Sequence, residues 1–229
     1  MIITIDGPSG TGKTTVAREV ANRLQFVYFD TGAMYRAFTW LVLKNNVDVM
    51  DVAEIERLLA TFEFNIIQEE GHKRYFTNGE DVTETIRSRP ITAFVSQVSA
   101  LKPVRDALLH IQHHFASGHN AVFEGRDLGS VVFPNAEVKI FLDADPQVRA
   151  ERRLAEMVEK RPQDAAVLSK EEMLADLIRR DTYDSNREVA PLRCPADAFK
   201  MDTTLLTIEE VVNQIVDYAH KTHPQHFVL

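Results

Sequence analysis

Short apolar runs alternate with longer amphipathic stretches along most of the chain. The apolar runs have the length of strands, and we expect strands at residues 2–6, 26–29, 121–124, 138–142 and 199–201. Apolar positions at helical spacing predict helices at residues 13–24, 31–43, 51–60, 91–115, 147–160, 170–183 and 207–220. Buried strands that alternate with helices are typical of an α/β fold, in which helices cover both faces of a parallel sheet.

The pattern changes between residues 62 and 84. Phe62, Phe64 and Ile66 occupy every second position there, and Asn78-Gly79 is a turn signal. We therefore expect a small antiparallel β insertion at about residues 62–84 of an otherwise alternating chain. Residues 221–229 follow the last amphipathic stretch, and we expect them to form a frayed tail.

Charge and composition narrow the classes of partner. The chain has 229 residues and a net charge of −8, from 34 acidic and 26 basic side chains, which argues against nucleic acid held by a broad basic face. No apolar run approaches the roughly 18 residues of a membrane span, and a start that meets Asp6 at once does not fit a secretory signal. The single Cys194 excludes a disulfide framework and a cysteine-built metal site. We expect a cytoplasmic protein.

A glycine-rich segment follows the first expected strand. Gly7 to Thr14 fits the pattern G-x-x-x-x-G-K-[ST], and a helix is expected to begin at Lys13. Glycines let successive backbone N–H groups curl around an anion, the Lys13 ammonium balances phosphate charge, and the Thr14 hydroxyl suits a Mg²⁺ ion. The alternative is a turn that binds nothing, but its place between a strand and a helix favours a nucleotide phosphate site. The motif alone does not separate kinases from GTPases, motors or transporters.

Several arginines stand beside glycine, aspartate or tyrosine rather than in exposed helical charge runs. Arg126 follows an expected strand, and Arg180 and Arg187 flank a short acidic segment. Guanidinium groups suit phosphate oxygens, and ligands of open α/β sheets bind at strand ends. An ion pair with Glu124 or Asp127 would also account for Arg126, and a solvated helix face would account for the other two arginines. A second polyanion brought against ATP would need such cations to offset the repulsion.

Beyond these motifs, longer stretches make the chain resemble the bacterial cytidylate kinases, P-loop enzymes that phosphorylate CMP and dCMP. The resemblance runs nearly end to end and is carried by TIDGPSG (4–10), DTGAMYR (30–36), GRDLGSVVFP (125–134), KIFLDA (139–144) and REVAPL (187–192). It implies one kinase unit over residues 1–229, in which the β insertion belongs to the monophosphate-binding part and a lid lies at about residues 153–166. It also implies Mg²⁺-dependent transfer of the γ-phosphoryl group of ATP to CMP or dCMP, by an enzyme that we expect to be a monomer.

The resemblance assigns functional residues position by position. ATP would be held by Gly7, Pro8, Ser9, Gly10, Thr11, Gly12, Lys13, Thr14 and Thr15, with Thr14 as the ligand of Mg²⁺. The phosphate of CMP would face Thr31, Tyr35, Arg36 and Arg126, with Arg180 and Asp184 near its ribose and phosphate. The cytosine ring would be surrounded by Ser96, Arg105, Asp127 and Arg187. The residues expected to act in catalysis are Lys13, Arg126 and Arg180.

Two other functions stay open at this point. A P-loop kinase could use a different nucleoside monophosphate or a small metabolite as acceptor, and the arginines favour an acceptor that is already phosphorylated. A nucleotide switch or binding protein is the more distant alternative, and it would carry an Asn-Lys-x-Asp motif, which the sequence lacks. Glu124 stands where the bacterial cytidylate kinases often have aspartate, so its carboxylate reaches further from the backbone.

Overall fold

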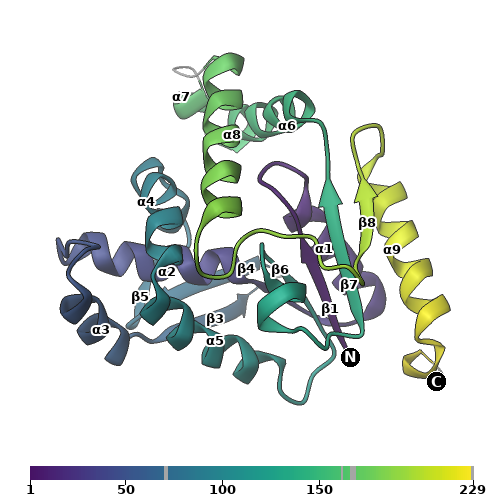
Figure 1. Cartoon of the computed structure of the whole chain (residues 1–229), viewed down its shortest axis with the longest axis horizontal. Coiled ribbons are helices and arrows are strands. Elements are labelled where there is room, and N and C mark those ends of the chain that lie inside the picture. Colours follow the sequence, from purple (N-terminus) through teal and green to yellow (C-terminus); the bar gives the residue numbers. More distant parts are fainter. Residues whose placement is uncertain (70–71, 161, 166–168, 228–229) are drawn as a thin grey trace. The chain divides into compact units, whose positions relative to one another are not determined.

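The apolar runs form strands of one sheet in the computed structural model of the chain, which describes residues 1–69, 72–160, 162–165 and 169–227 (Figure 1). The chain divides into two compact units, residues 1–29 with 116–229 and residues 30–115. Among the described residues, five strands follow the order β2 (Val27–Asp30), β6 (Ala121–Glu124), β1 (Ile2–Asp6), β7 (Val138–Asp143) and β8 (Phe199–Asp202). β1 runs parallel to β6 and β7, and β7 runs parallel to β8, so the expected parallel sheet is confirmed.

The core of the first unit is built from this sheet and two helices, α1 (Lys13–Leu24) and α9 (Ile208–Thr222). Ile3 and Ile5 of β1 are fully buried in one cluster with Val16 of α1 and Ile215 of α9. Apolar side chains recur at helical spacing on both helices, so each presents one continuous apolar face. Burial of these faces holds the end of β1 and the start of α1 in place, and the glycine-rich segment lies between them.

The expected frayed tail is wrong for the described part of residues 221–229. Helix α9 continues to Thr222, and a short 3₁₀ turn, η3 (Pro224–His226), follows it. The ring of Phe227 then stacks on Phe26, with ring centroids 6.1 Å apart and planes 8° from parallel. The chain is ordered up to Phe227 because this large apolar side chain packs on the core, and the mostly polar residues around it do not reveal that contact.

A group of helices lies between β7 and β8 along the chain of the first unit. It comprises α6 (Pro146–Lys160), the short α7 (Pro162–Ala165) and α8 (Lys170–Asn186). Ser169 and Glu172 form a reciprocal capping box that begins α8. The lid expected at about residues 153–166 stays a prediction, and residues 161 and 166 lie outside the described residues. None of the helices in the described part of the chain is long and apolar enough to cross a membrane.

The second unit contains the expected β insertion. Strands β3 (Phe64–Glu69), β4 (His72–Thr77) and β5 (Glu80–Asp81) form an antiparallel sheet, and Asn78 and Gly79 make the turn with φ of 49° and 81°. Around it lie α2 (Thr31–Lys44), α3 (Val52–Ala60), η1 (Thr85–Arg87), α4 (Arg89–Ala100) and α5 (Lys102–Ala116). The rings of Phe64 and Tyr75 stack across β3 and β4 at 6.0 Å, which anchors the insertion in its own unit.

The single helix expected at residues 91–115 is wrong, because the structure breaks it into α4 and α5. Leu101 is extended at the break, with φ of −67° and ψ of 124°. Pro103 has no N–H to offer the Ser99 carbonyl, and its ring would clash with that carbonyl in a continuous helix. The Arg105 guanidinium supplies the donor that Pro103 lacks, since its Nη1 donates to the Ser99 carbonyl at 3.1 Å. The break therefore fixes the position of Arg105, one of the residues expected around cytosine.

Candidate active site

The glycine-rich segment forms a loop between β1 and α1, as its sequence predicts. Gly7 and Gly10 have φ of 146° and 81°, in the region that favours glycine. A Cβ on Gly7 would lie 2.0 Å from the Leu142 carbonyl oxygen, and one on Gly10 would lie 2.9 Å from the Arg149 carbonyl oxygen. The loop thus keeps its shape only with glycine at both positions, because it packs directly against neighbouring backbone.

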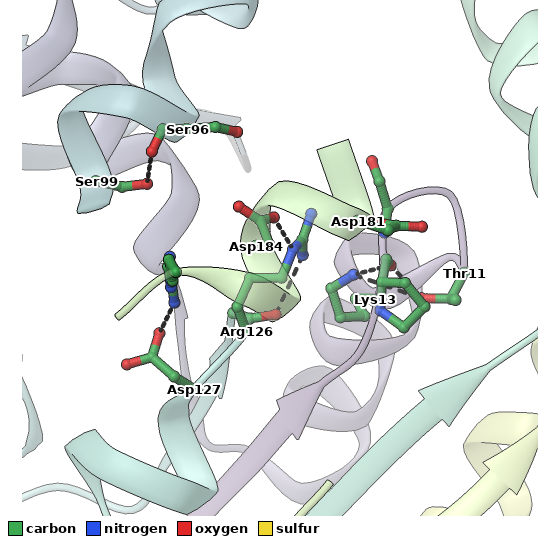
Figure 2. Close-up of polar contacts among 12 residues, drawn as sticks. Thr11, Lys13, Ser96, Ser99, Arg126, Asp127, Asp181 and Asp184 are labelled. Carbon is green, nitrogen blue, oxygen red and sulfur yellow. Dashed lines mark hydrogen bonds and ion pairs between the residues drawn. The ribbon is translucent and has the colours of Figure 1, made fainter. Parts of the chain in front are cut away.

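Lys13 is held over this loop rather than in solvent. Its ammonium donates to the Pro8 carbonyl at 2.6 Å and to the Thr11 hydroxyl at 3.4 Å, and the residue is 6% exposed (Figure 2). Burial lowers the pKa of Lys13, and the positive charge of Arg126 lowers it further. Lys13 is a desolvated cation at the start of a helix, and its contacts with Pro8 and Thr11 are to neutral oxygens, so an incoming anion is strongly favoured there.

Thr14 and Glu124 bring hard oxygen ligands together beside the loop. The Thr14 hydroxyl donates to Glu124 Oε2 at 3.0 Å, and the Tyr28 hydroxyl donates to Glu124 Oε1 at 2.6 Å. No group of three or more His, Cys, Asp or Glu side chains within the described residues forms a metal-binding cluster by itself. Mg²⁺ typically takes one or two protein oxygens and completes its shell with water and phosphate oxygens. The hydroxyl of Thr14 and the carboxylate of Glu124 fit that ion.

Arg126, in the segment after β6, is paired with a carboxylate that the sequence did not suggest. Its Nε contacts Asp184 Oδ2 of α8 at 3.2 Å, and neither Glu124 nor Asp127 is its partner in this contact (Figure 2). The Asp184 side chain is 4% exposed, so this ion pair lies in a region of low dielectric. The pair joins the β6 segment to α8 and places a guanidinium where two elements meet.

Arg180 lies on the same helix as Asp184. Its Nε is buried and has no hydrogen-bond partner among the described residues. Burial lowers the pKa of Arg180 to about 10, and the like charge of Arg126 contributes to the shift. A buried N–H without a partner is costly unless a ligand supplies one. Arg126 and Arg180 therefore form a local excess of positive charge that an anion would stabilise.

Asp127 and Arg187, both expected beside cytosine, are bonded to each other. Arg187 Nη2 lies 3.0 Å from Asp127 Oδ1, and the two side chains are 4% and 7% exposed. Arg187 Nε also donates to the Ala190 carbonyl at 2.5 Å, and Ala190 has a φ of 50°. The structure thus brings these two residues together in the first unit, in a buried and oriented pair.

Asp6 is a residue whose contacts sequence reasoning missed. It ends β1, and its carboxylate accepts from the backbone N–H groups of Leu128 at 3.0 Å and Gly129 at 2.8 Å. These groups begin η2 (Leu128–Val132), directly after Asp127. Burial raises the pKa of Asp6 to about 7, although both hydrogen bonds oppose the shift. An acidic residue at the end of an apolar strand was the available signal.

Arg149 and Asp181 are the second contact that sequence reasoning missed. Asp181 Oδ1 accepts from the Ser9 N–H at 3.0 Å, and Arg149 Nη1 donates to the Ser9 carbonyl at 2.8 Å. The same guanidinium forms an ion pair with Asp181 Oδ2. In the sequence both residues are ordinary charged positions on amphipathic helices, so no local pattern distinguishes them.

The second unit carries the other five residues expected to bind the acceptor. Thr31, Tyr35 and Arg36 lie on α2, which Asp30 caps by accepting from the Ala33 N–H at 2.9 Å. Arg36 Nη1 donates to the Ile86 carbonyl at 3.2 Å and to the Thr92 hydroxyl at 2.8 Å. These contacts orient its guanidinium along η1 and α4.

Ser96 and Arg105 lie on α4 and α5. The guanidinium carbon of Arg105 lies 5.4 Å from the centre of the Tyr35 ring, a cation–π distance. The Ser96 carbonyl accepts from the Ser99 hydroxyl at 3.1 Å. The structure therefore brings Tyr35 and Arg105 together, whereas the contact found for Ser96 involves its backbone.

The parallel sheet and the glycine-rich loop together define the class of protein to which the chain belongs. A glycine-rich phosphate loop between the first strand of a parallel sheet and the helix after it is the mark of P-loop nucleotide-binding proteins. The fold is also that of an uncharacterized protein from Eubacterium ventriosum ATCC 27560, with a TM-score of 0.51 and 11% identity over 96% of this chain and 98% of the other.

The family follows from the comparisons of sequence. The cytidylate kinase family model matches residues 3–221. The chain is 49% identical to the cytidylate kinase of Protochlamydia amoebophila (strain UWE25), over 95% of this chain and 96% of that relative. It is 43% identical to the cytidylate kinase of Halalkalibacterium halodurans, over 96% and 97% of the two chains. The chain belongs to the cytidylate kinase family and is a kinase.

Proposed function

We propose that the chain transfers the γ-phosphoryl group of ATP to CMP or dCMP, giving ADP and CDP or dCDP. The observation that carries this proposal is the match of the cytidylate kinase family over residues 3–221, together with 49% identity to a curated cytidylate kinase. The reacting bond is the one between the γ-phosphorus and the oxygen that bridges it to the β-phosphate. A phosphate oxygen of CMP attacks the γ-phosphorus as that bond breaks, and ADP leaves.

The donor side of the proposed site is the phosphate loop. Residues Gly7 to Thr15 hold the phosphates of ATP, in part through backbone N–H groups, and Lys13 carries the balancing charge. Pro8 has no N–H, and the Ser9 N–H is bonded to Asp181. In the structure Lys13 donates to neutral oxygens at 2.6 and 3.4 Å. Phosphate oxygens compete well for such a donor, because a charged acceptor makes a stronger hydrogen bond than a neutral one.

Thr14 and Glu124 are the residues that would hold Mg²⁺ on this side. The ion, when bound, neutralises charge on the phosphates of ATP. Thr14 would offer the lone pairs of its hydroxyl, whose proton is donated to Glu124, and Tyr28 would keep the Glu124 carboxylate in place through its 2.6 Å hydrogen bond. Glu124 therefore serves where aspartate is frequent in the family, since Tyr28 orients the longer side chain.

The acceptor phosphate is bound by arginines in this proposal. Arg126 and Arg180 supply the positive charge of the first unit, and Asp184 orients Arg126 through their 3.2 Å contact. Thr31, Tyr35 and Arg36 supply the groups of the second unit. These cations offset repulsion between two polyanions, and they matter most when charge spreads over the oxygens of the phosphoryl group in flight.

No general base takes part in this reaction. The second pKa of a phosphate monoester is about 6, so the attacking oxygen is already anionic at neutral pH. Kinases that phosphorylate a hydroxyl gain from a positioned carboxylate, which accepts the hydroxyl proton. In this site Asp127 and Asp184 orient arginines and the acceptor instead.

The cytosine ring is read by polar side chains in this proposal. The Asp127 carboxylate accepts from the N4 amino group of cytosine, whereas the oxygen of uracil at that position would be repelled. Arg105 and Arg187 donate to cytosine N3 and O2, and uracil carries an N3–H that opposes a donor. Ser96 can donate or accept and discriminates less.

The test is ADP formation from ATP with a panel of acceptors: CMP, dCMP, UMP, AMP, GMP and a non-phosphorylated sugar. We expect CMP and dCMP to exceed UMP by at least about 10²-fold in kcat/KM. A matched control is the Lys13→Ala variant, which should lose activity toward every acceptor alike. Preference for a different nucleoside monophosphate, or for the sugar, would overturn the assignment of the substrate. The cytoplasmic location and the monomeric state stay predictions.

A further inference from the structure

Two charged side chains, from α6 and α8, bind the backbone of one residue of the phosphate loop, Ser9. The Ser9 N–H donates to Asp181 Oδ1 at 3.0 Å, and the Ser9 carbonyl accepts from Arg149 Nη1 at 2.8 Å. Figure 2 shows Asp181 beside the loop that carries Thr11 and Lys13. Both backbone polar groups of Ser9 are therefore bonded to side chains from elements distant in the sequence.

The two side chains are themselves fixed. Arg149 Nε donates to the Ala144 carbonyl at 3.0 Å, and the Arg149 and Asp181 side chains are 6% and 15% exposed. The loop also packs on the backbone of α6, since a Cβ on Gly10 would lie 2.9 Å from the Arg149 carbonyl oxygen. Buried, mutually bonded groups of this kind hold one geometry well, because each has few alternative partners.

We propose that Asp181 and Arg149 are positioning residues that hold the phosphate loop in the shape that accepts the phosphates of ATP. The preorganised loop then pays less conformational entropy when ATP binds. The proposal deepens the proposed function, on which its kinetic part rests. It names two residues that sequence motifs do not mark, and neither of them needs to touch the nucleotide.

The charge of Asp181 does not make it a competitor of phosphate. Its second oxygen is bonded to the Arg149 guanidinium, so the pair has no net charge. A carboxylate without that partner would repel the phosphates of ATP across the loop. The neutral pair instead leaves the positive charge of Lys13 available to the ligand.

The Asp181–Arg149 pair also links the phosphate loop to residues expected to bind the acceptor. Asp181 lies on α8, directly after Arg180 and one helical turn before Asp184, which contacts Arg126 at 3.2 Å. A helix is a stiff element, so the position of α8 sets the loop and the arginines together. Asp181, which binds the loop, therefore shares one helix with Arg180 and Asp184, two of the residues expected near the acceptor.

The test uses Asp181→Ala, Asp181→Asn and Arg149→Lys in the whole chain, with Asp176→Asn as the matched control. Asp176 lies on α8 too, and its ion pair with Arg179 is exposed. For each variant we would measure KM and kcat for both substrates, the Kd of ATP by calorimetry without acceptor, and Tm. Calorimetry needs no turnover, so the role of Asp181 and Arg149 in ATP binding can be tested even if the chain fails to phosphorylate CMP.

We expect Asp181→Ala to raise the Kd and KM of ATP by about tenfold, the cost of one hydrogen bond to a charged group, with the KM of CMP changed less than about twofold. Asp181→Asn should recover part of the loss, because its carboxamide oxygen can still accept from the Ser9 N–H. Tighter ATP binding in Asp181→Ala would show that Asp181 competes with phosphate and would overturn the proposal. So would a fall in Tm with equal losses for both substrates and no recovery in Asp181→Asn, since that is a merely structural role.

Discussion

The phosphate loop and the arginine-bearing segment after β6 hold their cations in opposite ways. In the loop, the Lys13 ammonium donates to a carbonyl and a hydroxyl, both neutral. After β6, Arg126 contacts the carboxylate of Asp184 at 3.2 Å. Glycines, backbone contacts and the Asp181–Arg149 pair at Ser9 shape the loop, and its cation has no carboxylate bonded to it in these contacts. The cation of the second region is instead held by a carboxylate from a distant element.

This difference decides what an incoming anion must replace. A phosphate that reaches Lys13 exchanges neutral acceptors for charged ones, which strengthens each hydrogen bond. A phosphate that reaches Arg126 shares the guanidinium with a carboxylate that is already present. In the proposed reaction the loop would therefore bind phosphate more tightly, and the Arg126–Asp184 pair would hold a cation in place before the acceptor binds.

The largest expected effect concerns turnover. Both regions place a cation near the phosphoryl group in the proposed reaction, so Lys13→Ala and Arg126→Ala should each lower kcat by roughly 10²-fold or more. Steady-state assays of ADP formation, on variants whose folding is checked by circular dichroism, measure this. If a folded variant keeps near-normal turnover, its residue does not act in catalysis. The corresponding region would then not place a catalytic cation near the phosphoryl group.

The second effect concerns the choice of base. Arg187 Nη2 lies 3.0 Å from Asp127 Oδ1, and Arg187 has a second contact, with the Ala190 carbonyl, that does not involve Asp127. Asp127→Ala should reduce the preference for CMP over UMP from about 10²-fold to about tenfold or less, because the acceptor for the amino group is lost. Asp127→Asn offers an N–H to uracil and should reduce the preference further. Rates for both nucleotides with each variant give the ratio, and an unchanged ratio means that Asp127 does not read the base.

Sequence could predict the loop well and the region after β6 only in part. The loop is a contiguous run of nine residues from Gly7 to Thr15, and glycine, lysine and threonine at fixed spacing express its chemistry directly. The carboxylates that contact Arg126 and the Ser9 N–H come from α8, and Arg149, which contacts the Ser9 carbonyl, comes from α6; both helices follow β6 and β7 along the chain. Charged residues on a helix look alike in sequence, so the pairs that tie α8 to the site emerge only from the fold.

The same distinction holds for the secondary structure. The strands and the β insertion were predicted because alternation and apolar runs are local patterns. The break at Leu101 was missed although Pro103 lies two residues away, because the apolar spacing continues across it. The ordered chain end was missed because Phe227 stacks on Phe26, from the opposite end of the sequence. Long-range packing decided the end of the described chain, whereas the break is a local effect of Pro103 that the continuing apolar spacing conceals.

The third effect separates the two regions by stability. Arg126→Ala leaves the Asp184 carboxylate buried without this cation, which is costly in a region of low dielectric. Lys13→Ala removes a buried cation whose pKa burial already lowers, so it removes a destabilising charge. Thermal unfolding should therefore show a Tm lower by several degrees for Arg126→Ala and unchanged or higher for Lys13→Ala, at about 2–4 °C per kcal/mol for a chain of this size.

A double variant sharpens this result. Adding Asp184→Asn to Arg126→Ala removes the uncompensated charge, so most of the lost Tm should return while turnover stays low. Equal losses of Tm in Lys13→Ala and Arg126→Ala would show that both cations are held by similar contacts. The contrast between the two regions would then be wrong.

The smallest effect lies at the residue that joins the two regions. Asp6 precedes the loop directly and accepts from the backbone of Leu128 and Gly129 in the second region. Burial raises the pKa of the Asp6 carboxyl from 3.8 to about 7. Between these two pH values the folded state therefore keeps a proton on Asp6 that the unfolded chain releases. The contribution of Asp6 to stability is then fully present below about pH 4 and is lost as the pH rises through about 7.

Asp6→Asn removes this titration and keeps one acceptor oxygen, while its amide N–H opposes the second backbone N–H. The wild-type Tm should exceed that of Asp6→Asn by more at about pH 5 than at about pH 8, with a change of a few degrees. Asp197→Asn is a suitable control, because the Lys139 ammonium lowers the pKa of Asp197 and its titration ends below this range. A difference that stays constant or grows with pH would show that Asp6 is ionised throughout. An ionised Asp6 carboxylate would then join the phosphate loop to the segment after β6. The loop, like that segment, would be held in part by a charged side chain at this point.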